Sequence, residues 1–212
     1  MRKGAITILR SISVVLLMLL PLVVAALFRD AGHVPDEAVA EARSSLEQYM
    51  MLHPEYSART LAVVDFSRPS FLKRMEVIDL QTGKRWTYRV AHGKNSGEIQ
   101  ARRFSNVPES NMSSLGLFRV DEAYYGDHGL AMRLDGLDSL QNGNAAMRDI
   151  VLHSADYVSI PYILLNLFTF SGPRIGRSNG CFVVARDDVT PVVSKLTGGG
   201  FIYAWDGKAK QH

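Results

Sequence analysis

Cys181 is the residue of this sequence with the clearest chemical potential, because it is the single cysteine and stands where a loop becomes a strand. Polar and glycine-containing residues 173–180 precede it, and the apolar run 182–184 follows. A cysteine attacks as its thiolate, which is favoured by nearby positive charge and N–H donors. Arg174 and Arg177 supply charge in this stretch. The residue types and their spacing therefore predict a nucleophilic thiol.

The same turn also offers an oxyanion hole. The backbone amides of Asn179, Gly180 and Cys181 can converge on negative charge that develops beside the sulfur. Two other interpretations of Cys181 stay open, namely a small buried hydrophobic residue that opens a strand and a partner in an intermolecular disulfide. A lone cysteine has no motif value without a base, so the prediction depends on finding one.

His153 is the best placed base among the six histidines. It follows the apolar run 150–152 and precedes the polar Ser154, so it stands at the end of a predicted strand. A histidine and a cysteine at the ends of neighbouring strands can meet at one rim of a sheet and share a proton. A structural histidine at a strand end is the alternative. His92 and His128 lie in glycine-flanked loops, where each either lines a cleft or makes a local turn hydrogen bond.

No metal site is expected, because the chain has no second cysteine and no pair of histidines four residues apart. Cysteine chemistry without a metal is therefore the expectation.

Strand-like patterns dominate the rest of the chain and must position these residues. An amphipathic helix is predicted at residues 35–51 and a second, short helix at 187–196. Long polar loops at 92–97 and 104–114 separate some of the strands. The predicted class is mainly β (α+β), a β-sandwich or partly closed barrel with an N-terminal helix and a short C-terminal helix. The predicted strands are residues 61–66, 74–80, 84–91, 116–121, 130–134, 149–153, 181–184 and 200–205.

The N-terminal residues 1–28 have the pattern of an export signal or a membrane anchor. Arg2, Lys3 and Arg10 precede residues 11–28, which carry no charged side chain. We expect the protein in the periplasm or at the extracytoplasmic face of the inner membrane, with contact to that membrane where the segment is retained. In an oxidising compartment an unpaired thiol is a hazard, which favours a functional role for Cys181.

Charge and length limit the partners and the domain count. The net charge is +3, with 24 basic and 21 acidic side chains, and three of the basic ones lie in residues 1–28. The remainder is neutral, so no nucleic-acid partner is expected. The domain boundaries are a signal or anchor at 1–28, a lead-in helix and linker at 29–59, a catalytic domain at 60–206 and a tail at 207–212.

These residues resemble the YkuD-type L,D-transpeptidases, and most of all the murein L,D-transpeptidase catalytic domain family. His153 lies upstream of a segment, residues 176–181, that is similar to the family's pattern of Ser or Thr, His, Gly and Cys. The similarity covers about residues 60–205 in the family's order. Its further matching segments are residues 90–97, 104–106, 113–117, 124–129 and 153–159.

The resemblance implies an exported enzyme that acts on peptidoglycan stem peptides. Cys181 would attack the carbonyl of the diamino-acid residue, expel the terminal D-amino acid and hold a thioester, which the amine of a second stem then attacks. His153 would be the general base and acid, and the amides around Gly180 and Cys181 the oxyanion hole. No metal or organic cofactor is implied.

The sequence also departs from the wider family. Asn179 stands where that family has histidine, the basic residue that often follows the cysteine is missing, and the gap between His153 and Cys181 is longer. Arg174 or Arg177 then becomes the expected partner of a substrate carboxylate. The full set of candidate substrate-binding residues is Ser154, Tyr157, Arg174, Arg177, Ser178 and His92.

Three functions and one segment remain open from the sequence. The leading function is transpeptidation, by cross-linking or by exchange of the terminal D-residue. The alternatives are a carboxypeptidase or endopeptidase on the same fold and a non-catalytic wall-binding module. The uncharged residues 160–170, between base and nucleophile, are interpreted as a lid over the cleft, with a core helix as the alternative.

Overall fold

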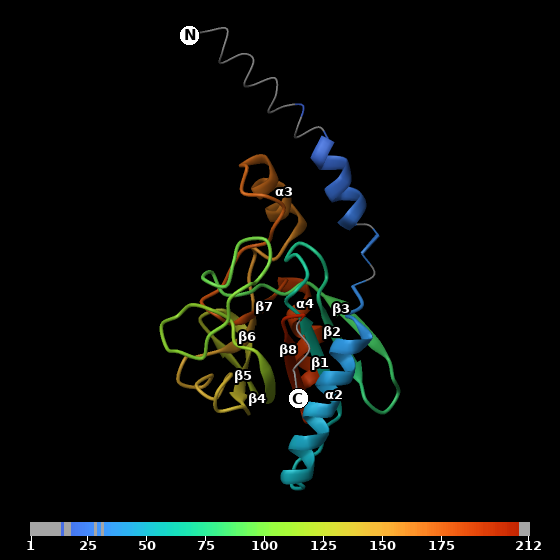
Figure 1. The fold of residues 1–212 in the computed structure, drawn as a ribbon, viewed down its shortest axis with the longest axis vertical. Coiled ribbons are helices and arrows are strands. Elements are labelled where there is room, and N and C mark those ends of the chain that lie inside the picture. The colour runs from blue at the N-terminus through green and yellow to red at the C-terminus, as the bar shows by residue number, and fades with distance from the viewer. Residues whose placement is uncertain (1–13, 15–17, 28, 31, 208–212) are drawn as a thin grey trace.

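Short runs of β-branched and aromatic residues build one eight-stranded sheet at the centre of the protein (Figure 1). The computed structural model describes residues 14, 18–27, 29–30 and 32–207. All eight predicted strands are present, and β4 extends five residues further than predicted, to Gly126. The strands are β1 Thr60–Asp65, β2 Met75–Asp79, β3 Arg85–Tyr88, β4 Gly116–Gly126, β5 Gly129–Gly136, β6 Val151–Ser154, β7 Phe182–Val184 and β8 Gly200–Trp205.

The strand order β3-β2-β1-β8-β4-β5-β6-β7 brings the two ends of the sheet almost together. β1 pairs in parallel with β8, and β6 in parallel with β7, whereas the other pairs are antiparallel. Beyond β3, Ala91 forms an antiparallel bridge to Val183 of β7, with its N–H 2.8 Å from the Val183 carbonyl. This bridge nearly closes the sheet, which confirms the prediction of a partly closed barrel.

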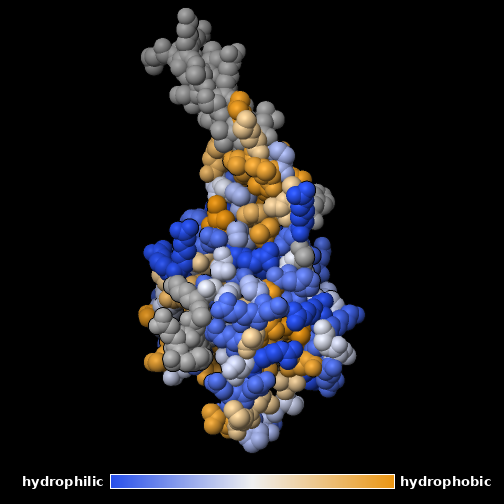
Figure 2. All heavy atoms as spheres, turned by 45° about the vertical axis from the view of Figure 1, so that its right-hand side comes forward, coloured by the Kyte–Doolittle hydropathy of each residue, from blue (hydrophilic) through white to orange (hydrophobic). Residues whose placement is uncertain are grey.

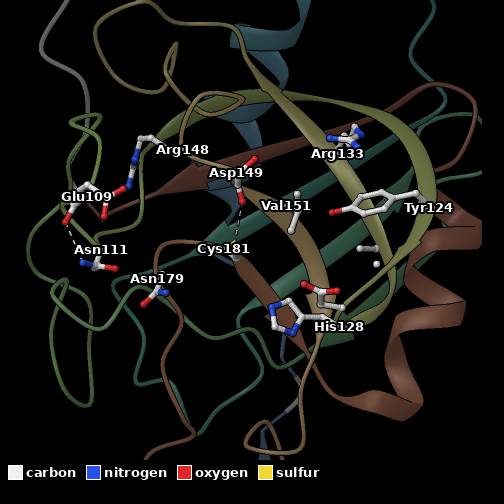
Figure 3. Close-up of a pocket in the computed structure, with 13 residues that line it drawn as sticks. Glu109, Asn111, Tyr124, His128, Arg133, Arg148, Asp149, Val151, Asn179 and Cys181 are labelled. Atoms are coloured by element: carbon white, nitrogen blue, oxygen red, sulfur yellow. Dashed lines mark hydrogen bonds between the residues drawn. The ribbon is translucent and has the colours of Figure 1, made fainter.

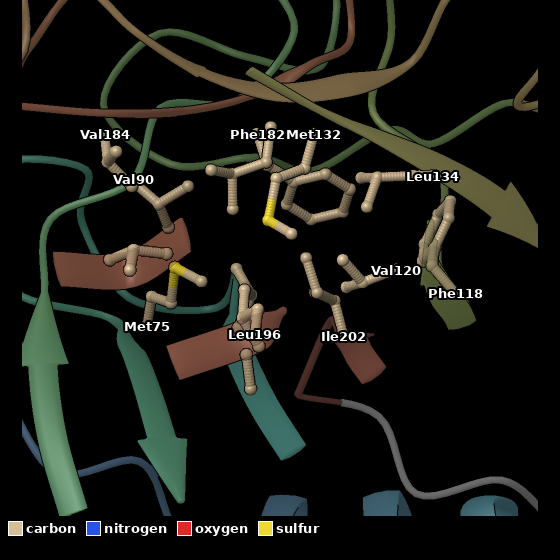
Figure 4. Close-up of a cluster of buried hydrophobic side chains, with 14 of the residues drawn as sticks. Met75, Val90, Phe118, Val120, Met132, Leu134, Phe182, Val184, Leu196 and Ile202 are labelled. Atoms are coloured by element: carbon tan, nitrogen blue, oxygen red, sulfur yellow. The ribbon is translucent and has the colours of Figure 1, made fainter. Parts of the chain in front are cut away.

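The interior of the barrel is the main hydrophobic core (Figure 4). The predicted C-terminal helix is present as α4, Arg186–Leu196, whose Val189, Val192, Val193 and Leu196 are buried. These side chains join one cluster with residues from most of the strands, among them Phe118 of β4 and Phe182 of β7. Burial of so many aliphatic and aromatic groups is what stabilises the curvature of the sheet.

The predicted N-terminal helix is α2, Asp36–Leu52, and it covers the outer surface of β1 and β8. Its buried stripe packs on a second cluster that includes Leu61, Phe201 and Trp205. Glu41 fixes the docking, because its carboxylate accepts hydrogen bonds from the Tyr203 hydroxyl at 2.6 Å and from the Trp205 indole N–H at 3.0 Å.

A third cluster lies on the outer surface beside β7. The helix α3, Ile160–Phe168, contributes Ile163 and Leu167, and the helical segment at residues 18–27 contributes Val23. Figure 2 shows hydrophobic side chains gathered at the end of the molecule that carries these two helices. Within the described residues no helix is both long enough and apolar enough to cross a membrane. Most of the predicted signal or anchor at 1–28 lies outside the described residues, as does most of the tail.

Candidate active site

The register of two parallel strands puts Cys181 and His153 on the same face of the sheet. β6 and β7 align His153 with Val183, and Cys181 lies two residues before Val183, directly before β7. Since side chains alternate along a strand, Cys181, His153 and Val183 point to one side, and Phe182 points into the barrel interior. Cys181 and His153 are therefore diagonal neighbours on the outer face, where side chains can meet.

His153 is held in one tautomer by the backbone of the next residue. Its Nδ1 lies 3.1 Å from the Ser154 carbonyl oxygen, and because a carbonyl can only accept, Nδ1 carries the hydrogen. The neutral ring then presents Nε2 as a proton acceptor. Burial lowers the pKa of His153, the bond to Ser154 opposes this, and His128 adds to the lowering. The ring is thus neutral and basic at Nε2 around pH 7.

The Cys181 thiol is half-buried, and the groups around it shift its pKa in opposite directions. Its Sγ donates to the Asp149 carbonyl at 3.4 Å. Burial is the largest influence and raises the pKa of Cys181, with a further rise from the Asp149 carboxylate. The backbone amides of Val151 and of Cys181 itself, and the charge of Arg148, lower this pKa. The resting group is a thiol that has thiolate-stabilising donors already in place.

Cys181 opens onto a cavity of about 610 Å³ (Figure 3). Among the described residues, non-glycine backbones with positive φ occur at Glu109, Asn111, Asp149 and Phe170, and the first three of these line the cavity. Backbone strain of this kind collects at functional sites. The lining residues are Glu109, Asn111, Tyr124, Gly126, Asp127, His128, Ala131, Arg133, Arg148, Asp149, Val151, Asn179 and Cys181.

The hairpin of β4 and β5 forms one wall of this cavity. His128, in its turn, stacks on His153 with the ring centroids 4.4 Å apart and the planes 20° from parallel. The guanidinium of Arg133 lies 4.7 Å from the centre of the Tyr124 ring. Arg133 is also aligned with Val151 of β6, which places it on the same face as the thiol.

The site therefore combines a cysteine at the cavity with backbone donors and an oriented histidine, as acyl transfer through a thiol requires. His153 itself is buried and is not among the residues that line the cavity, where His128 is stacked on its ring. A family model described as L,D-transpeptidase catalytic domain matches residues 32–205. The chain belongs to the L,D-transpeptidase catalytic domain family. The resemblance found in the sequence is thereby confirmed.

Solved structures give a more distant comparison. An L,D-transpeptidase from Mycobacterium smegmatis is 14% identical, with a TM-score of 0.40 and coverage of 70% of this chain and 59% of that chain. The LD transpeptidase LdtMt1 in complex with imipenem is 15% identical, with a TM-score of 0.40 and coverage of 69% and 59%. This chain thus spans less than two thirds of the length of either protein. A search of curated proteins returned no match.

The three amides predicted for the oxyanion hole of this L,D-transpeptidase domain differ in their surroundings. Asn179 and Cys181 line the cavity. The N–H of Gly180 donates to Ser178 Oγ at 3.1 Å, so it is engaged within the turn. Gly180 has a φ of +126°, and a methyl group there would lie 2.8 Å from the Met112 carbonyl oxygen. Only glycine fits this close approach without a shift of backbone.

Ser178 has a structural setting. Residues 176–180 have the G-x-S-x-G spacing of a serine nucleophile elbow. However, Ser178 is buried, and its Oγ donates to the Cys181 carbonyl at 2.8 Å while it accepts from Gly180. Ser178 therefore shapes the turn that presents the cysteine.

Arg174 and Arg177, the predicted partners of a substrate carboxylate, are joined to an acid of the protein. One carboxylate oxygen of Glu98 accepts a hydrogen bond from Arg177 Nη1, and the other oxygen lies 3.5 Å from Arg174 Nε. Arg177 also donates to the Lys94 carbonyl at 3.2 Å. Neither arginine is among the residues that line the cavity.

His92, Ser154 and Tyr157 also lie outside the set of cavity-lining residues. His92 is fully buried between Arg74 and the Gly97 carbonyl. Ser154 acts on His153 through its backbone carbonyl, and its side chain is buried. Tyr157 is close enough to Cys181 for charge on the sulfur to raise its pKa, which burial, the larger cause, brings to about 12.

Sequence reasoning missed Arg148, Tyr124, Arg133 and Asp149, and it left His128 undecided. One signal for Arg133 was available, because alternation along residues 130–134 places Arg133 and Ala131 on the side opposite to Met132 and Leu134. Nothing local marked Arg148 or Asp149, whose positions depend on the turn before β6.

Proposed function

We propose that this chain is an exported peptidoglycan L,D-transpeptidase that works through a thioester on Cys181. The observation that supports it most is that the half-buried Cys181, which lines a cavity, lies on the same face of the sheet as His153. The Ser154 carbonyl that fixes the His153 tautomer adds to this support. The substrates proposed are the stem peptides of the cell wall, in cross-linking or in exchange of the terminal D-residue.

In the first half-reaction the Cys181 thiol turns from Asp149, gives its proton to His153 Nε2 and attacks the carbonyl of the diamino-acid residue. The backbone amides of Asn179 and Cys181 stabilise the oxyanion that forms. His153 then gives the proton to the departing amine of the terminal D-residue as the C–N bond breaks. A thioester on Cys181 remains.

In the second half-reaction an amine of another stem or a free D-amino acid attacks the thioester carbonyl. His153 removes a proton from that amine, the new amide bond forms, and the C–S bond breaks. The proton then returns from His153 to the sulfur. Water in place of the amine would give hydrolysis through the same steps.

The cavity also has a cation suited to a carboxylate of the stem peptide. Arg133 lines the cavity, its side chain is 56% exposed, and the Glu122 carboxylate lies at 3.9 Å, at the outer limit of an ion pair. A guanidinium so placed can exchange that contact for a substrate carboxylate. We assign this role to Arg133 in place of Arg174 and Arg177.

Export is proposed from the sequence of residues 1–28, and with it a location in the periplasm or at the inner membrane. Three cations followed by the uncharged residues 11–28 have the order of an export signal. A fusion of residues 1–28 to a reporter enzyme that is active only after export tests this. Activity is expected with the segment and none without it, and an inactive fusion would contradict export.

The function is tested with purified protein and stem peptides, analysed by mass spectrometry with and without an acceptor stem. Cross-linked or exchanged products are expected, and Cys181→Ala should form none while its melting temperature stays nearly unchanged. A carbapenem should add covalently to the wild type and not to Cys181→Ala. Release of the terminal residue without transfer would identify a carboxypeptidase or endopeptidase, and binding without any product a wall-binding module.

A further inference from the structure

Arg148 lies in the turn before β6 and is bound by the long loop before β4. Its Nη1 donates to the Ser105 carbonyl at 2.7 Å and to Ser114 Oγ, and its Nη2 donates to Ser110 Oγ at 3.2 Å and to the Met112 carbonyl. These four bonds use all four Nη hydrogens of the guanidinium. Arg148 is therefore fixed in place by residues 105–114.

The fixed guanidinium lies beside the nucleophile. A methyl group built on Gly180, the residue directly before Cys181, would be 3.2 Å from Arg148 Nη2. Arg148 and Cys181 both line the cavity, and the charge of each favours the charged form of the other (Figure 3). Since its Nη hydrogens are already engaged, Arg148 is suited to act by its charge rather than by binding a substrate group.

We propose that Arg148 is the fixed cation that favours the thiolate of Cys181, a positioning residue that acts on the nucleophile and not on the substrate. The inference rests on the proposed nucleophilic role of Cys181. In this proposal, the function of the long polar loop 105–114 is to hold the Arg148 guanidinium in position. A guanidinium keeps its charge throughout the pH range in which a thiol titrates.

The effects of other groups around the sulfur must be distinguished from the effect of the Arg148 charge. The Asp149 carboxylate opposes the thiolate, and Glu109 and Asp127 add acidic side chains to the cavity wall. His153 and the His128 ring stacked on it lie on the same side of the sheet, and Tyr157 lies nearby. None of these groups is itself replaced in an Arg148 variant, so a comparison of a variant that keeps the charge with one that removes it isolates the charge.

The test is the rate at which iodoacetamide alkylates Cys181, measured against pH by intact-protein mass spectrometry. Cys181 is the single cysteine, so every adduct reports on it. Arg148→Gln should shift the profile to higher pH and lower the rate at pH 7 about tenfold, the equivalent of one pKa unit. Arg148→Lys, which keeps the charge, should stay within about threefold of the wild type.

The control is the double variant Ser110→Ala, Ser114→Ala, which removes two of the loop bonds and leaves the charge. It should label within about threefold of the wild type. A profile for Arg148→Gln equal to that of the wild type, or an equal shift in the serine control, would overturn the inference. If Arg148→Gln does not fold, as judged by thermal melting, a tenfold loss in Arg148→Lys would overturn it instead.

The labelling assay needs no transpeptidase activity, so the two proposals fail separately. A shifted profile in a protein that transfers no acyl group would support the role of Arg148 and contradict the proposed function. An active enzyme with an unshifted Arg148→Gln profile would support the proposed function and contradict the role of Arg148.

Discussion

His92 and Arg74 form a fully buried polar pair. Arg74 Nη2 donates to His92 Nδ1 at 2.8 Å, and its Nε and Nη2 both donate to the Val90 carbonyl. His92 Nε2 in turn donates to the Gly97 carbonyl at 3.0 Å. Burial first, and then the charge of Arg74, lower the pKa of His92 to about 3. The pair fixes the loop that follows β3 and keeps His92 neutral.

This arrangement predicts acid sensitivity. The pKa of His92 is about 3 when folded and about 6.5 when unfolded, so its neutral form stabilises the fold above pH 6.5, and this contribution is lost as the pH falls towards 3. From pH 7 to pH 5 the loss is about 2 kcal/mol. His92→Gln keeps an acceptor for Arg74 and a donor for Gly97 but does not titrate. Urea unfolding at both pH values should show a smaller loss in this variant, and equal losses would contradict the assignment.

Residues whose position depends on the adjacent chain could be singled out from the sequence. Cys181 and His153 were found because each marks a change between loop and strand, and such changes are local. Arg148 was not found, because its four acceptors come from a loop more than thirty positions earlier. Likewise, nothing near Arg177 in the sequence indicates that Glu98 will bind it.

At the scale of elements, the sequence left open whether residues 160–170 are a lid over the cleft or a core helix. Residues 160–168 are a helix, as the spacing of Ile163 and Leu167 indicated, and both of these side chains are buried. Leu165 and Phe168 are 57% and 52% exposed. The residues that line the cavity come from other parts of the described chain, so α3 does not cover the cavity in this structure.

The two faces of α3 should respond differently to substitution. Ile163→Ala or Leu167→Ala should each cost about 2–5 kcal/mol of stability, since both remove buried groups. Leu165→Ser with Phe168→Ser should change stability by about 0.5 kcal/mol or less for each residue. If the exposed face closes over substrate as a lid, the second variant should raise the ratio of hydrolysis to transfer in the stem-peptide assay. An unchanged ratio would leave α3 as a purely structural helix.

The strands themselves were predictable because β-branched runs bounded by turn residues specify them locally. Their order was not, since the parallel pairs β1 with β8 and β6 with β7 join distant parts of the chain. The wall formed by the β4–β5 hairpin, and with it the stacking of His128 on His153, follows from that order.

At the scale of the whole molecule, the helical segment at 18–27 is an addition to a domain that the family model places at residues 32–205. Val23 is buried in the cluster with Ile163 and Leu167. Removal of residues 1–28 should therefore lower the free energy of unfolding by about 1.5–3 kcal/mol, as for loss of one buried aliphatic side chain. Cys181 alkylation at pH 7 should stay within about twofold of the full chain, as judged by mass spectrometry. A truncated protein that fails to fold would show that this segment is part of the core.

The bridge between Ala91 and Val183 has a consequence for the order of folding. β7 has three residues and is held by β6 on one side and by this bridge on the other, both through contacts between distant parts of the chain. Contacts that close long loops form late, because the chain must first lose much of its entropy. Cys181 therefore reaches its position beside β6, which carries the proposed base His153, only at a late stage. Until the barrel has closed, Cys181 is an ordinary cysteine, so the acyl-transfer chemistry proposed for it requires the finished fold.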